Sequence, residues 1–181
     1  MPARQTTPTG RPQSSGRPTR ARTTGVAAGA VTSAPPRGLP PTTLVLSIVG
    51  LVIAAYLTVE HFTASTTLAC PETGAINCAK VTTSSYASVL GVPVAVLGLV
   101  WFGAMVTLCL PRAWRSGNPW LGRARLAAAG VGALSVLYLV WVELFRVNAI
   151  CLWCTAIHLL TLALFVAIVL GQATTQPHDS R

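Results

Sequence analysis

Four apolar segments, each close to the length of a membrane-spanning helix, constrain this chain more than any other feature of its sequence. A bilayer core about 30 Å thick needs about 20 helical residues. The segments run from about Thr43 to Phe62, Val89 to Leu110, Leu121 to Phe145 and Asn148 to Leu170. They predict an all-α membrane protein, a four-transmembrane-helix bundle formed by residues 41–172. We expect residues 1–40, rich in Pro, Thr, Gly, Ser and Arg, to be a disordered cytoplasmic tail, and residues 173–181 a short cytoplasmic tail.

The composition argues against an ordinary soluble domain, because 52% of the residues are hydrophobic and only 9% are charged. The net charge of +9 does not predict a nucleic-acid partner, since the arginines lack interleaved aromatic residues and a recognisable binding fold. Short loops rich in positive charge face the cytoplasm. Arginines precede the first segment and surround the connection between the second and third segments: Arg37, Arg112, Arg115, Arg123 and Arg125. We therefore expect a multi-pass plasma-membrane protein with both termini in the cytoplasm and residues 63–90 and 146–150 outside.

Four of the five cysteines fall on the predicted outer side. Cys70 and Cys78 lie in the first outer loop, and Cys151 and Cys154 form a C-x-x-C at the start of the fourth segment. A helix beginning near Asn148 would place the second pair on one face in its first turns. Unpaired amides there lower a thiol pKa and favour the thiolate that attacks disulfides. Because the C-x-x-C would close only a small ring, we interpret it as a redox pair rather than a structural disulfide.

Other polar residues in the apolar segments receive simpler interpretations. His158 follows Cys154 by one helical turn and is either a ligand contact or a packed helix histidine. Cys109, at the inner end of the second segment, is predicted to be a small buried hydrophobic residue. Side chains at the outer helix ends are interpreted as lying at the lipid headgroups: Glu60, His61, Glu143 and Arg146.

The outer loop reads CPETGAINCAKVTTSSYASVLGVP from Cys70 onward. The stretch Val81 to Leu90 mixes apolar residues with Ser and Thr, which predicts a short helix at the membrane surface. Gly91 and Pro93 would break this helix before the second segment begins. A mobile loop with two thiols above a helix with two more predicts a relay, in which one pair meets a soluble partner and the other meets the membrane.

Two other classes of function fit parts of this pattern. Cys151, Cys154 and His158 would share a helix face, and zinc binds thiolate and imidazole. A metal-binding or metal-transporting membrane protein is therefore the main alternative. Disulfides also persist outside the cytoplasm, so a structural membrane protein with static disulfides is a further alternative. Simple c-type haem attachment is excluded, because Thr155 rather than His follows the C-x-x-C.

The cysteines in this order resemble the vitamin K epoxide reductase family, particularly bacterial members without a fused thioredoxin-like domain. The resemblance covers about residues 43–171. It rests on the two loop cysteines, the Ser/Thr-containing stretch, the Gly91-Val92-Pro93 break and the C-x-x-C of the last span. A DsbB-like thiol oxidase also has four spans and four cysteines, but its C-x-x-C lies in the first outer loop.

The resemblance implies a quinone-dependent thiol-disulfide oxidoreductase that supports disulfide-bond formation. Cys70 would exchange with an extracytoplasmic thioredoxin-fold, DsbA-like protein acting in trans. Cys78 would pass oxidation between Cys70 and Cys151, with the active site on the outer face.

The resemblance also implies a binding site for a quinone, either menaquinone or ubiquinone. Cys154 would face the quinone and deliver electrons to it. His158 falls where family members can place a side chain that hydrogen-bonds a quinone carbonyl. The second such position of the family, an Asn, corresponds to the apolar Val94 here.

Overall fold

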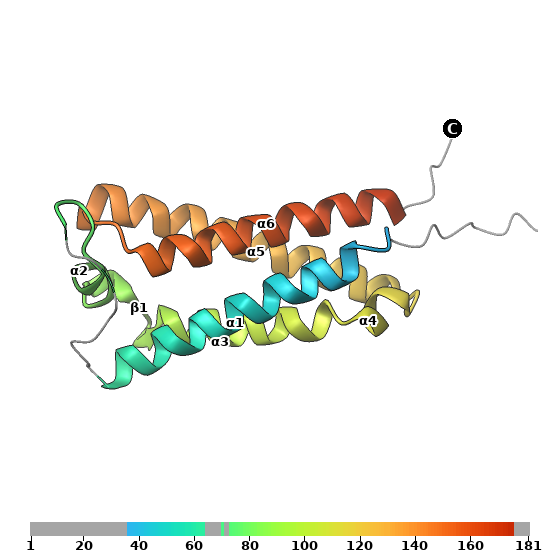
Figure 1. Cartoon of the computed structure of the whole chain (residues 1–181), viewed down its shortest axis with the longest axis horizontal. Helices are drawn as coiled ribbons and strands as arrows, with labels where there is room; N and C mark the ends of the chain where they lie inside the picture. Colours follow the sequence, from blue (N-terminus) through green and yellow to red (C-terminus); the bar gives the residue numbers. More distant parts are fainter. Residues whose placement is uncertain (1–35, 64–69, 71–72, 176–181) are drawn as a thin grey trace, which may run out of the picture. The chain divides into compact units, whose positions relative to one another are not determined.

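Four helices form the core of the protein. The structure, a computed structural model, describes residues 36–63, 70 and 73–175. The helices are α1 (Leu39–Thr63), α3 (Val94–Leu108), α5 (Pro119–Val142) and α6 (Leu152–Thr175). Helix α1 packs against α3 and α6, and α5 packs against α6 and α3 (Figure 1). Helices α1 and α6, and α5 with the turn that follows it, are long and apolar enough to cross a membrane, whereas α3 is a shorter apolar helix. The mostly helical membrane fold is thus confirmed, but four full-length spans are not.

The second predicted span, 89–110, is shortened at both ends. Strands β1 (Ser88–Val89) and β2 (Val92–Pro93) pair antiparallel, so helix α3 starts only at Val94. Leu90 and Gly91 connect the strands with φ angles of 53° and 82°, the pattern of a type I′ hairpin turn. At the other end, α4 (Pro111–Arg115) follows after a break. The 15 residues of α3 extend about 22 Å, which is less than a bilayer core.

The loop before α3 also differs from the prediction. The prediction of a single short helix over residues 81–90 is wrong. The structure has α2 (Cys78–Thr82) and a 3₁₀ turn, η1 (Ser85–Ala87), separated by the extended backbone of Ser84. Asn77 starts α2 by accepting a hydrogen bond from the Lys80 backbone N–H at 2.7 Å. In Figure 1, α2 and β1 lie at the end of the bundle where α6 begins, and α4 lies at the other end. We call the first of these the cysteine end.

The fourth helix begins later than predicted. Helix α5 is followed by a π-helical turn, η2 (Glu143–Val147), and Asn148 then adopts a left-handed conformation with φ 50°. Because Ile150 pairs with the loop, the chain stays extended until Leu152, where α6 starts. The predicted tails lie largely outside the described residues. Within the described part, Leu39 and Pro40 belong to α1, and residues 173–175 belong to α6.

The end of the bundle opposite the cysteines has a buried core. Cys109 is fully buried there, in a cluster with Met105, Ala129, Leu164 and Ile168, as predicted for a small hydrophobic residue. Arg125 was expected in the exposed connection between the second and third segments, but it lies within α5 and is buried. Its Nε donates to the Leu108 carbonyl at 3.0 Å, and its guanidinium lies 3.7 Å from the centre of the Trp114 ring.

Candidate functional site

The two loop cysteines form a disulfide. Cys70 and Cys78 are bonded, with their Cα atoms 6.2 Å apart. Cys78 is fully buried at the start of α2, whereas Cys70 is partly exposed. Cys70 is therefore the more accessible residue of this pair.

Backbone pairing brings the loop to the C-x-x-C. Ile76 and Ile150 form an isolated parallel bridge. The Ile150 N–H donates to the Ala75 carbonyl at 2.8 Å, and the Asn77 N–H donates to the Ile150 carbonyl at 3.1 Å. The residues just before Cys78 are thereby held against the residue just before Cys151. The structure thus brings the predicted cysteine pairs to the same end of the bundle.

Cys151 occupies the N-cap position of α6. Its sulfur accepts a hydrogen bond from the Cys154 backbone N–H at 3.3 Å, and its carbonyl accepts the first helical bond from Thr155 at 2.8 Å. The hydrogen bond with the Cys154 side chain, together with backbone N–H groups, lowers the pKa of Cys151 below its ordinary value of 9.0 despite burial. The cap stabilises a thiolate at Cys151. The predicted effect of the helix N-terminus is present, although the helix starts four residues later than expected.

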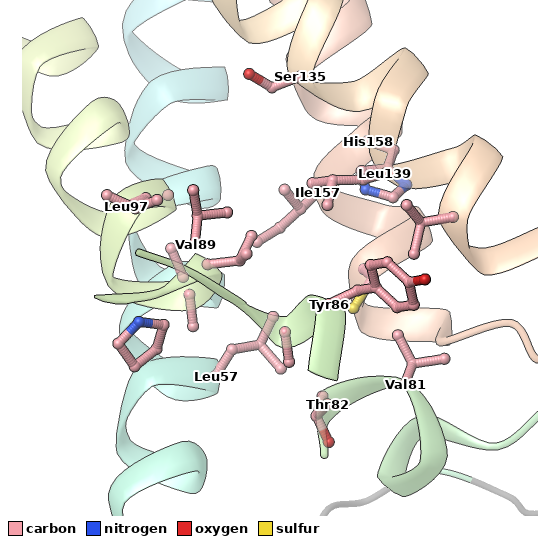
Figure 2. Close-up of a pocket in the computed structure, with 18 of the residues that line it drawn as sticks. Leu57, Val81, Thr82, Tyr86, Val89, Leu97, Ser135, Leu139, Ile157 and His158 are labelled. Atoms are coloured by element: carbon pink, nitrogen blue, oxygen red, sulfur yellow. The ribbon is translucent and has the colours of Figure 1, made fainter. Parts of the chain in front are cut away.

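Cys154 faces a large cavity of about 1240 Å³. Its lining is mostly apolar and comes from all four long helices and from the loop (Figure 2). Among the labelled side chains, Leu57 belongs to α1, Leu97 to α3, Leu139 to α5 and His158 to α6, and Tyr86 belongs to the loop. Both cysteines of the loop disulfide also line the cavity. A cavity of this size and polarity can hold a drug-sized apolar ligand.

His158 adds a polar group to the cavity wall formed by α6. It lies one turn from Cys154, lines the same cavity, and is only 5% exposed. Ser135 on α5 also lines the cavity, but its hydroxyl already donates to the Val131 carbonyl at 2.9 Å. His158, the predicted ligand contact, thus faces the cavity close to the Cys154 thiol.

The sequence agrees with one protein-family model over most of its length. The model of the vitamin K epoxide reductase family matches residues 41–169. The chain belongs to the vitamin K epoxide reductase family. The matched region contains the starts of α3, α5 and α6, all but the first two residues of α1, and all the cysteines of the site. The family is one of membrane redox enzymes, so the disulfide and the neighbouring thiols are interpreted as parts of a redox site.

Val94, the apolar residue at the position where the resemblance implies an Asn, lines the cavity at the first turn of α3.

The metal-binding alternative finds no set of ligands in the described part of the chain. Within residues 36–63, 70 and 73–175, no group of three or more His, Cys, Asp or Glu side chains is arranged to hold a metal ion. Cys151 is an N-cap with its sulfur engaged by Cys154, whereas His158 lies along the cavity wall.

Two features of this vitamin K epoxide reductase family member escaped the sequence analysis. Glu143 was expected at the headgroup level, but it is only 6% exposed and lines the cavity. Arg146, also expected at the headgroups, donates from Nε to the Tyr86 hydroxyl at 2.9 Å and so ties η2 to η1. An acid at the end of an apolar run marked Glu143 as unusual but did not show which way its side chain faces. No pattern in the sequence pointed to the second feature.

Proposed function

We propose that the protein is a membrane thiol:quinone oxidoreductase that oxidises a thioredoxin-fold partner outside the cytoplasm and passes two electrons to a quinone. In this role it supports disulfide-bond formation in exported proteins. Family membership supports the redox class. The backbone pairing of Ala75 and Asn77 with Ile150 carries the finer proposal, because it holds the loop disulfide beside the C-x-x-C.

The first exchange takes place at the loop disulfide. A thiolate of the reduced partner attacks the partly exposed Cys70, the Cys70–Cys78 bond breaks, and Cys78 leaves as a thiolate. The second partner thiol then displaces Cys70, which yields an oxidised partner and a reduced loop pair. Attack at the more accessible residue agrees with the burial of Cys78.

The second exchange passes the electrons inward. The Cys78 thiolate attacks Cys151 in the oxidised C-x-x-C, and Cys154 leaves. Cys70 then attacks Cys78, which restores the loop disulfide and leaves Cys151 and Cys154 as thiols. The structure has this distribution, with Cys70 bonded to Cys78 and the other two cysteines unbonded.

The cavity beside Cys154 suits a quinone. Its mostly apolar lining matches a lipid-soluble ring and tail, and buried His158 offers an imidazole to a ring carbonyl. A bound quinone accepts the two electrons and two protons that are released when the Cys151–Cys154 disulfide forms. This chain's part is to hold the Cys154 thiol at the cavity wall.

We place the cysteine end outside the cytoplasm and the arginine-rich end inside. The charges around α4, including Arg112 and Arg115, support this orientation through the positive-inside rule. The burial of Arg125 does not change this orientation, because Arg112, Arg115 and Arg123 are exposed at the arginine-rich end.

The deciding experiment is quinone-dependent oxidation of a reduced thioredoxin-fold protein by the purified enzyme. We expect Cys154→Ser to abolish turnover. Cys70→Ser should block the protein partner while a small dithiol still reduces the inner pair. Cys109→Ala is the matched control, since this thiol is buried at the opposite end of the bundle, and it should retain turnover. Normal oxidation of the partner by Cys154→Ser would contradict the proposal.

A further inference from the structure

A buried carboxyl that the relay does not use lies next to its inner cysteines. Glu143 is the first residue of η2, and its carboxyl accepts a hydrogen bond from the Cys151 backbone N–H. Its charge also acts on both Cys151 and Cys154. A carboxyl in this position is within electrostatic reach of the two sulfurs that must gain and lose protons.

Glu143 also lies between two cavities. It lines the large cavity together with Cys154 and His158, and it lines a smaller one of about 220 Å³ at the cysteine end. Exposed residues, including Leu144 and Asn148, line the smaller cavity, which therefore opens to the surface. Among the residues that line these two cavities, only Glu143 belongs to both. The carboxyl therefore lies between the cavity that Cys154 lines and the cavity that opens to the surface.

The charged groups around Glu143 leave its carboxyl to the cysteines. Arg146, on the same turn, donates to Tyr86, and Lys80 on the neighbouring α2 is exposed. Within the described ranges, neither cation forms an ion pair with Glu143. From α6, the titratable groups at the shared cavity are Cys154 and His158, and α5 contributes Tyr138. Glu60 and His61 line the cavity from the end of α1.

We propose that Glu143 is the proton-transfer group of the Cys151–Cys154 pair and exchanges protons with the outer surface through the smaller cavity. The inference rests on the proposed function. When Cys78 attacks Cys151, the Cys151–Cys154 bond breaks and the Cys154 thiolate takes a proton from Glu143. Glu143 then takes a proton from the outer surface through the smaller cavity, which restores its own protonation state. When the Cys151–Cys154 bond forms again, the two thiols release two electrons and two protons, all of which pass to the quinone.

The test compares Glu143→Gln with Glu143→Asp in the full-length protein. The Gln side chain keeps an oxygen that can accept from the Cys151 N–H, but it cannot exchange a proton. The Asp side chain keeps an acid on a shorter stem. Three quantities are measured: the pH profile of turnover, the Cys151 thiol pKa in the reduced protein without quinone, and the unfolding temperature as a control for folding.

We expect Glu143→Gln to unfold like the wild type but to turn over about 100-fold more slowly, with one limb of the pH profile lost. Glu143→Asp should restore the limb and most of the turnover. Because the Glu143 charge raises the pKa of Cys151, its removal should lower that pKa and increase the thiolate. A slower enzyme with more thiolate is a result that a merely structural role does not produce.

Two outcomes would overturn the inference: a Gln variant within about twofold of wild-type turnover, or a slower variant whose pH profile keeps its shape. Failure of the proposed function gives a different result, because the wild type itself would then not oxidise the partner with quinone. In that case the role of Glu143 is tested by the pH dependence of the reduction of Cys151–Cys154 by dithiothreitol, which needs no quinone. An identical pH dependence in wild type and Gln variant would overturn the role of Glu143.

Discussion

The Cys151 sulfur lies 3.3 Å from the Cys154 backbone nitrogen and accepts its hydrogen bond. This contact makes one cysteine of the C-x-x-C the cap of the helix that holds the other. The cap and the Cys154 side chain both favour charge on Cys151, whereas burial opposes it. The thiol that meets the loop pair is therefore the one whose ionised form the helix stabilises.

Replacing Cys154 with Ala should raise the pKa of Cys151, because it removes the hydrogen bond that lowers that pKa most. The thiolate at Cys151 should then form only at higher pH than in the parent protein. The measurement is a pH titration of thiolate absorbance in a background with Cys70, Cys78 and Cys109 changed to Ala. An unchanged or lower midpoint in the Cys154→Ala protein would contradict this assignment.

The pairing of Ile76 with Ile150 predicts which cysteines can be trapped together. In a Cys70→Ala, Cys154→Ala double variant, Cys78 and Cys151 should form a disulfide under mild oxidation. The bond is detected by mass spectrometry of a non-reducing proteolytic digest.

The matched control for this trap is the Cys78→Ala, Cys154→Ala variant, which leaves Cys70 and Cys151. It should form much less of the corresponding bond, because the backbone pairing precedes Cys78 directly and not Cys70. Equal trapping in both variants would mean that the pairing does not select the route of exchange.

The cysteines were identifiable from the sequence because their chemistry belongs to the residue type and to its spacing. The contact that aligns them was not. Ile76 and Ile150 meet through backbone hydrogen bonds between two irregular segments, which leave no periodic pattern of side chains. The late start of α6 has the same origin, since Ile150 stays extended to make this pairing.

Burial of Glu143 could not be predicted from its place at the end of an apolar segment. Helix phase decides which way such a side chain faces, and a π-helical turn changes the phase where Glu143 lies. The hairpin before α3 was hidden for another reason. Leu90 adopts a φ of 53°, which a leucine rarely does, so only Gly91 marked the turn.

Replacing His158 with Phe should weaken quinone binding while sparing the thiol chemistry. The change removes a buried polar partner, which costs about 1–3 kcal/mol or roughly 5- to 150-fold in affinity. We expect a higher KM for quinone and an unchanged rate of reduction of Cys151–Cys154 by a small dithiol. Ser135→Ala is the control at the same cavity. Its hydroxyl is already bonded to Val131, so it should change KM by about twofold at most. A normal KM in the Phe variant would assign His158 to helix packing.

Replacing Arg125 with Met should destabilise the bundle without altering the redox site. Arg125 donates to the carbonyl of Leu108, the last residue of α3, which has no partner within its own helix. Loss of this bond and of the contact with the Trp114 ring should lower the free energy of unfolding by about 1–3 kcal/mol. Thermal unfolding in detergent measures the change. Arg123→Met is the control, since this exposed neighbour on α5 should shift stability by about 0.5 kcal/mol at most. Below its unfolding temperature, the Arg125 variant should keep the wild-type thiol pKa of Cys151. A shift of the Cys151 pKa would mean that the two ends of the bundle are coupled. Equal unfolding temperatures for the Arg125 and Arg123 variants would show that the Arg125 contacts do not stabilise the bundle.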